Sequence, residues 1–171
     1  MGVTRLIGLD DASVLATLAT RNRTTMRPYE PRRDEDFFTP AGKRTRITDA
    51  LDQHDRGYLL PYVILNEGEV VGTIALNEII RGPLQSASVG YWVDEAHRGR
   101  GLATAALSEI LAAAFGELGL HRVQAGTLID NERSQRVLAR CGFVRYGLAP
   151  SYLLIDGAWR DHVLFQVLAP T

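Results

Sequence analysis

The sequence predicts an α+β fold in α/β/α layers, with a mostly antiparallel mixed sheet of about seven strands and helices on both faces. Two observations lead to this fold. The first is the order of the elements that the hydrophobic pattern indicates, β-α-α-β-β-β-α-β-α-β-β. The second is a run of three strands joined by short turns, which is typical of an antiparallel meander. The 171 residues contain no low-complexity linker, so we expect one domain over residues 1–171.

The N-terminal part is expected to contribute one short strand and two helices. The strand lies at 3–7, and Asp10-Asp11 supplies N-cap candidates for a helix over about 11–20. A loop over 21–42 follows, rich in charge, proline and aromatic residues. A second helix is predicted over about 43–55. Because a long irregular loop is unusual inside a compact domain, this loop is a candidate for function.

The central part is predicted to form the meander. Residues 58–65 and 69–80 pattern as strands around the turn Asn66-Glu67-Gly68. A second turn at Arg81-Gly82-Pro83 leads into a third strand over 87–93. The short connections predict antiparallel pairing of these three strands.

A crossover is predicted after the meander. The strand 87–93 is followed by a helix over 102–118, where Leu107 and Leu111 belong to one apolar stripe, and then by a strand over 122–127. A strand, a helix and a strand in this order normally form a right-handed parallel crossover.

The C-terminal part is predicted to be a helix and a hairpin. The helix over 131–140 is followed by Gly142, a natural residue after a helix end. Strands over 146–155 and 159–168 are joined by Asp156-Gly157, which is a strong hairpin signal.

Composition excludes several classes of function. With 19 basic and 20 acidic residues the net charge is −1, so a broad basic face for nucleic acid is not expected.

Cys141 is the only cysteine, which excludes an intrachain disulfide, and its apolar neighbours suggest a small buried side chain. The four histidines form no metal-binding spacing, so no metal is expected. No signal pattern and no apolar run of about 18 residues is present, so we expect a cytoplasmic protein without a membrane partner.

The most informative segment is the loop Arg98-Gly99-Arg100-Gly101-Leu102-Ala103, between a predicted strand and a predicted helix. Such a loop aims backbone N–H groups and the positive end of a helix at one point, which suits a phosphate. Glycines allow close approach and positive φ, and arginines can pair with phosphate oxygens. An ordinary β–α turn with two solvated arginines is the alternative.

The spacing excludes two other phosphate loops. No lysine follows Gly101, as a P-loop requires, and Thr104 stands where the dinucleotide pattern G-x-G-x-x-G needs glycine. Coenzyme A is the remaining common ligand of a loop of this kind.

The loop resembles the R/Q-x-x-G-x-G/A signature of the GNAT acyltransferases, with Arg98, Gly101 and Ala103 at the matching positions. The predicted element order is similar to that fold. Other segments resemble the RimJ/RimL branch of N-terminal acetyltransferases that modify ribosomal proteins, and its RimJ side most closely. These segments are Arg21-Asn22-Arg23, Tyr29-Glu30-Pro31, Gly90-Tyr91-Trp92, Asn131-Glu132-Arg133-Ser134, Arg140-Cys141-Gly142-Phe143 and the stretch from Tyr152 to His162.

The resemblance implies a donor site for acetyl-CoA. Its pyrophosphate would lie on the loop amides of Arg98–Thr104, and its pantetheine arm would pair with the backbone at the end of the preceding strand. Asn131 would contact the arm, and Ser134 would lie near the sulfur and serve the leaving thiolate. An ordinary helix start, with Asn131 as N-cap, explains the last pair equally well. The expected contacts are Tyr91, Trp92, Val93, Arg98, Gly99, Arg100, Gly101, Leu102, Ala103, Thr104, Asn131 and Ser134.

The general base and the acceptor pocket are less defined. An α-amino group has a pKa near 8, so a weak or remote carboxylate suffices, and Glu78 and Glu30 are candidates. Both could equally be solvated surface groups. The pocket is expected where loop 21–42 meets the final hairpin, and a structural role is expected for His162. The candidate pocket residues are Tyr29, Glu30, Asp156 and Trp159.

The resemblance therefore implies transfer of an acetyl group from acetyl-CoA to the α-amino group of a ribosomal protein, by direct attack in a ternary complex. The apolar setting of Cys141 argues against a covalent enzyme intermediate. Two alternatives stay open: acetylation of a small-molecule amine, and a non-catalytic acyl-CoA-binding module. The protein could be a monomer or a homodimer.

Overall fold

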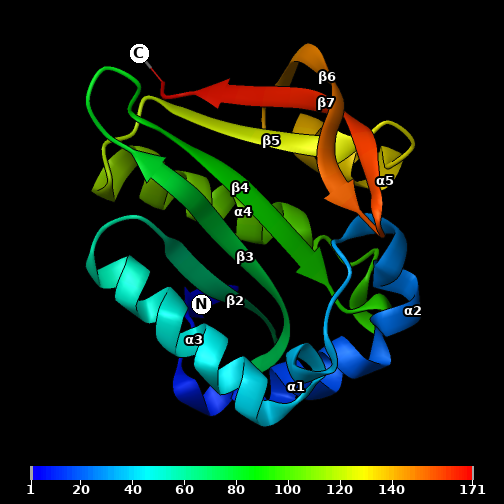
Figure 1. The fold of residues 1–171 in the computed structure, drawn as a ribbon. Coiled ribbons are helices and arrows are strands. Elements are labelled where there is room, and N and C mark those ends of the chain that lie inside the picture. The colour runs from blue at the N-terminus through cyan, green and yellow to red at the C-terminus, as the bar shows by residue number, and fades with distance from the viewer. Residues whose placement is uncertain (1, 171) are drawn as a thin grey trace.

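The computed structural model describes residues 2–170 and contains a seven-stranded sheet with helices on both faces (Figure 1). The strand order across the sheet is β1-β2-β3-β4-β5-β7-β6. The predicted fold class is therefore confirmed. The strands are β1 (Thr4–Leu6), β2 (Leu60–Asn66), β3 (Glu69–Ile80), β4 (Ser86–Val93), β5 (Arg122–Leu128), β6 (Val144–Ile155) and β7 (Ala158–Leu168).

The helices occupy the connections and the N-terminal region. The α-helices are α1 (Ala12–Arg21), α2 (Arg23–Met26), α3 (Pro40–Asp55), α4 (Leu102–Ala112) and α5 (Glu132–Arg140). A short π-helical segment, Ala113–Glu117, extends α4. Short 3₁₀ helices occur at Leu9–Asp11, Arg27–Tyr29, Glu35–Phe38 and Glu95–His97. No helix within residues 2–170 is both long and apolar enough to span a bilayer.

One junction in the sheet differs from all the others. Every neighbouring pair is antiparallel except β4 and β5, which run parallel and are connected through α4, as predicted. Within the described chain these two strands pair only from Ser86 with Arg122 to Ser88 with Gln124. Beyond this point β4 continues to Val93 and β5 to Leu128, and the two strands diverge (Figure 1).

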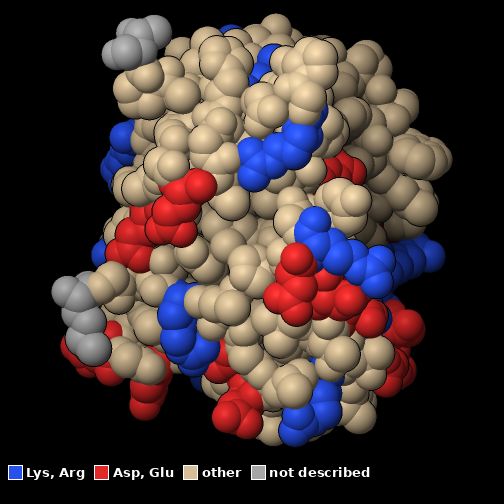
Figure 2. Space-filling view, turned by 90° about the vertical axis from the view of Figure 1, so that its left-hand side faces the viewer, with Lys and Arg blue, Asp and Glu red and all other residues tan. Residues whose placement is uncertain are grey.

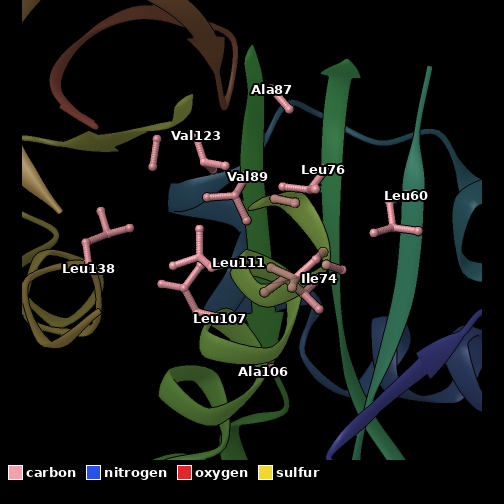
Figure 3. Close-up of a cluster of buried hydrophobic side chains, with 14 of the residues drawn as sticks. Leu60, Ile74, Leu76, Ala87, Val89, Ala106, Leu107, Leu111, Val123 and Leu138 are labelled. Atoms are coloured by element: carbon pink, nitrogen blue, oxygen red, sulfur yellow. The ribbon is translucent and has the colours of Figure 1, made fainter. Parts of the chain in front are cut away.

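Two hydrophobic cores hold the sheet from opposite faces. Val63 and Ile64 are adjacent on β2 and both fully buried, yet they belong to different cores because side chains alternate along a strand. The core with Ile64 contains residues of α4 and α5, such as Leu107 and Leu138 (Figure 3). The core with Val63 contains residues of α1 and α3. Both faces of the meander are thus fixed, which positions β4.

Acidic and basic side chains are interspersed over the face of the molecule shown in Figure 2. On the right-hand half of this face several acidic side chains lie together, with basic side chains beside them. This distribution agrees with the near-zero net charge.

The predicted loop over 21–42 is wrong in part, because most of it forms short helical turns. The predicted start of the second helix at 43 is also wrong. Pro40 opens α3, and the hydroxyl of Thr39 accepts a hydrogen bond from the N–H of Gly42 at 3.0 Å. Proline marks a break in a pattern but is well tolerated in the first turn of a helix.

Two expectations for single side chains need correction. Asp11 precedes α1, but its carboxylate does not cap the helix; it accepts hydrogen bonds from Arg5 and from the N–H of Gly8, each at 2.8 Å. Cys141 is half-buried instead of fully buried, with its Sγ 3.5 Å from the carbonyl oxygen of Thr104. Both side chains are engaged by partners that no local pattern reveals.

The core assignment predicts the effect of Leu107→Ala. Leu107 is fully buried on α4 between the helix and the sheet, so the truncation leaves a cavity. We expect a loss of about 2–5 kcal/mol in the free energy of unfolding, measured by urea denaturation. Leu84→Ala is the control, because Leu84 is 49% exposed, and it should change stability little. Equal losses in the two variants would contradict this packing.

Candidate active site

A cavity of about 870 Å³ opens where β4 and β5 diverge. Its walls include β4 from Val89 to Val93 and β5 from Ala125 to Leu128. The loop before α4 and the first turns of α4 and α5 complete it. The backbone N–H and C=O groups that point into the gap lack a strand partner, so an extended ligand with amide groups can pair with them as an added strand.

The glycine loop forms the end of this cavity. Gly99 and Gly101 both have φ near +76°, and an added Cβ at either position would meet no atom within 4 Å. Gly101 is the N-cap residue of α4, so the free N–H groups of the helix point toward the cavity. Leu102, Ala103 and Thr104 follow in the first turn, and all three line the cavity.

The two arginines of this loop differ in position. Arg98 lines the cavity, and its guanidinium donates to the carbonyl oxygen of Val93 at 3.3 Å and contacts Sδ of Met26 at 3.6 Å. Arg100 does not line the cavity; its side chain turns back to the carbonyl oxygen of Ala96 at 3.5 Å. Arg98 is therefore the arginine of the pair that is placed to meet a ligand.

A buried carboxylate holds the loop against the N-terminal helices. Asp94 is 1% exposed and accepts hydrogen bonds from Arg21, from Asn22 at 2.7 Å and from Nδ1 of His97 at 2.7 Å. Asn22 is equally buried and accepts from the N–H of Glu95 at 2.9 Å. Burial alone would raise the pKa of Asp94, but the hydrogen bonds from Asn22, His97 and Arg21 outweigh burial and lower it.

The start of α5 faces β4 across the cavity. The side chain of Asn131 accepts a hydrogen bond from the N–H of Ser134 at 3.2 Å, so the predicted N-cap is confirmed. Both residues also line the cavity. The hydroxyl of Ser134 lies 2.9 Å from the phenol oxygen of Tyr91. Burial raises the pKa of Tyr91 to about 12, so this phenol keeps its proton at neutral pH.

The sequence did not reveal the contact between Tyr91 and Ser134. From the sequence we expected a role only for the backbone of Tyr91. The contact of its side chain with Ser134 could not be predicted, because the two residues are 43 positions apart. It also missed several residues that line the cavity. Among them are Met26, His97, Thr127, Asp130 and Glu132.

The predicted acceptor residues are brought together only in part. Tyr29 lines the cavity, and the carbonyl oxygen of Glu30 accepts from the N–H of Asp156 at 3.0 Å, which joins the 21–42 region to the final hairpin as expected. Glu30 lies 3.7 Å from Arg33, and Asp156 lies 2.9 Å from Arg27. The hydrogen bond from Arg27 lowers the pKa of Asp156. The side chains of Glu30, Asp156 and Trp159 are outside the cavity wall.

Two further predicted residues have defined positions. Glu78 is exposed, with φ +52°, in an irregularity of β3 next to the pair of Asn77 with Ser88, where the gap begins. It does not line the cavity. His162 is 4% exposed, packs against the ring of Tyr152, and does line the cavity.

Comparison with known proteins agrees with this geometry. Residues 4–144 match the acetyltransferase (GNAT) domain, so the chain belongs to the GNAT family and is an acyltransferase. It is 36% identical to the probable N-acetyltransferase YjcK of Bacillus subtilis, over 97% of this chain and 93% of that one. It is 34% identical to the ribosomal protein uS5-alanine N-acetyltransferase of Escherichia coli, over 98% and 88% of the two chains. The structure of Mycobacterium smegmatis RimJ in complex with CoA-disulfide superposes with a TM-score of 0.93, at 34% identity over 97% and 81%. The predicted resemblance to the RimJ/RimL branch is confirmed.

The buried carboxylate predicts a pH dependence of stability. Because the pKa of Asp94 is lowered in the folded state, its contribution is complete above its ordinary pKa of 3.8 and is lost as the pH falls through the lowered value. The substitution Asp94→Asn should therefore lower the free energy of unfolding by about 3 kcal/mol at pH 7. The difference from the unmodified protein should shrink as the pH falls below about 4.

Urea unfolding at a series of pH values measures this effect. Asp55→Asn is the control, because Asp55 is exposed at the end of α3, and it should behave like the unmodified protein. A stability difference for Asp94→Asn that stays constant down to pH 2 would contradict the assignment.

Proposed function

We propose that this protein transfers the acetyl group of acetyl-CoA to the α-amino group of a ribosomal protein, by direct attack in a ternary complex. The observation that carries the proposal is the gap between β4 and β5, which connects the glycine loop at Gly101 with the hydroxyl of Ser134. The relative that modifies alanine of uS5 supports the acceptor class. Such an acceptor implies a cytoplasmic reaction.

The donor would lie along the gap. Its pyrophosphate accepts hydrogen bonds from the amides at the start of α4, where Arg98 adds positive charge. Its pantetheine amides pair with the gap-facing backbone groups of β4 between Tyr91 and Val93, apart from the Val93 carbonyl oxygen that Arg98 engages, and with the side chain of Asn131. The thioester carbonyl then lies beside β4, and the backbone N–H groups stabilise the oxyanion that forms during attack.

The reaction replaces the C–S bond of the thioester with a C–N bond at the same carbonyl carbon atom. The neutral amine attacks the thioester carbonyl, a C–N bond forms, and the C–S bond breaks. The leaving thiolate takes a proton from the Ser134 hydroxyl, which regains one from water, and the phenol of Tyr91 at 2.9 Å holds this hydroxyl in place. The amine loses its proton through water to a carboxylate. Glu78 is the better candidate for this base, because Glu30 is engaged by Arg33.

The acceptor would enter between the N-terminal helices and the final hairpin. Tyr29 and His162 line the cavity on this side. The remaining candidates for contact with the peptide are Glu30, Asp156 and Trp159, which lie where the 21–42 region is joined to the final hairpin. Trp159 is 64% exposed and thus available to a peptide that extends away from the cavity.

Substitution of Ser134 and Tyr91 tests the chemistry. Ser134→Ala should lower kcat about 100-fold, because the thiolate loses its proton donor, and Tyr91→Phe should lower it less. The KM for acetyl-CoA should change by no more than about twofold. Ser108→Ala is the matched control, since the Ser108 hydroxyl bonds to the carbonyl oxygen of Thr104 in its own helix. Unchanged kcat in Ser134→Ala, measured by thiol release, would remove this residue from the mechanism.

Acceptor assays test the function itself. We expect peptides that begin with Ala or Ser, taken from ribosomal proteins, to gain one acetyl group at the α-amine, located by fragment mass spectrometry. The same peptides with a blocked N-terminus and an internal lysine are the control and should not react. Acetylation of free amino acids or polyamines in place of the peptides would favour a small-molecule enzyme. Binding of coenzyme A without turnover of any amine would indicate a non-catalytic module.

A further inference from the structure

The exposed apolar side chains of this protein are concentrated on the C-terminal hairpin. Within residues 2–170, eight of the fifteen exposed large apolar side chains lie between positions 144 and 168, although this stretch is a small part of the chain. On a soluble protein, a concentration of this kind marks a surface that another molecule covers. Six of the eight belong to β6, and these are Val144, Tyr146, Leu148, Tyr152, Leu153 and Leu154.

β6 is an edge strand with little protection against pairing (Figure 1). It pairs with β7 and with no other strand of the described chain, and of its 12 residues only Arg145 is charged. The opposite edge strand, β1, has only 3 residues, and Arg5 on it is held by Asp11 at 2.8 Å. Short length and charge are common devices against edge-to-edge pairing. The edge at β1 is therefore protected, whereas a partner strand can approach β6.

The exposed side chains of β6 lie on both faces of the sheet. Leu148 is opposite Val163, which belongs to the core that contains residues of α4 and α5, and residues paired across two strands share a face. Tyr146 lies on the other face, because its hydroxyl is 3.4 Å from Oε1 of Gln124, which alternates along β5 with the core residue Val123. A helix that packed on one face would leave the other face exposed. A partner strand beside the edge reaches both faces.

The accessible surface of the chain is large enough to supply an interface. It amounts to 9537 Å², whereas a compact monomer of 18.9 kDa exposes about 8300 Å². The excess of about 1200 Å² is larger than the roughly 800 Å² that one partner contributes to a stable interface. The area that a dimer requires is thus present, and the hairpin holds its most apolar part.

We propose that two copies of this chain form a homodimer in which their β6 edges lie side by side and antiparallel about a twofold axis. The second copy is the partner that fits best, because a twofold axis brings the same apolar and nearly uncharged edge opposite itself. Pro150 has no N–H to donate, so the pairing uses residues 144–149. β7 separates β6 from the gap beside β5, so the cavity stays open and the inference does not depend on the proposed function.

Light scattering during size-exclusion chromatography of the full chain tests the proposal. At about 50 µM we expect a mass twice the 18.9 kDa of one chain. In the double variant Val144→Lys/Leu148→Lys, positive charges from both copies meet at the edge, so the mass should fall to that of one chain. Sedimentation equilibrium should show a dimer dissociation constant raised by about 100-fold or more. Both substituted side chains are exposed, so the far-UV circular dichroism spectrum should not change.

Ile80→Lys/Leu84→Lys is the matched control, because both side chains are about as exposed as Leu148 but lie at the turn between β3 and β4. This variant should remain a dimer. The milder variant Val144→Thr/Leu148→Thr, which keeps good strand formers in an edge strand, should weaken the dimer by about tenfold.

Three results would overturn the proposal. The first is a mass of one chain for the unmodified protein, and the second is a dimer that survives both pairs of substitutions on β6. The third is a monomer in which these substitutions abolish acetylation of an intact ribosomal protein but not of a short peptide, which would assign the surface to the acceptor. None of these results bears on the binding of coenzyme A.

Discussion

The rest of the site depends on the incomplete pairing of β4 with β5. Parallel strands normally share hydrogen bonds along their length, but here the ladder ends at Ser88 and Gln124. Backbone groups beyond that point are without a strand partner inside a folded domain, where such groups need a partner from water or a ligand. The gap thus lowers the stability of the protein without ligand, and it also provides a binding surface of fixed geometry.

Packing on both faces keeps this gap open. β4 is anchored by β3 on one side, and β5 by β7 on the other, while α4 and α5 bury Leu107 and Leu138 beneath the diverging strands. At the end of β4 the buried carboxylate of Asp94 connects the loop to the N-terminal helices. A polar group buried at this position is stable only because each of its lone pairs is engaged. The donor loop and the acceptor side of the protein therefore share one rigid support.

The sequence predicts local features well and contacts between distant segments poorly. The strand meander, the crossover and the glycine loop follow from alternation, spacing and turn chemistry, and Asn131 is recognisable as an N-cap. The start of α3 was predicted too late, because a proline such as Pro40 can interrupt a helix or occupy its first turn. The pairing of Tyr91 with Ser134, and of Asp94 with Asn22, joins residues 43 and 72 positions apart. No local pattern specifies such contacts, since they arise from the packing of whole elements.

Amide hydrogen exchange with and without coenzyme A tests the central claim most directly. If the gap holds the pantetheine arm as an added strand, coenzyme A should slow exchange at the amides of β4 between Val89 and Val93 that face the gap. Coenzyme A should also slow exchange at the amides from Gly99 to Thr104. Amides of β2, on the far side of β3, should be unaffected. Protection confined to the glycine loop, with β4 unchanged, would contradict the account.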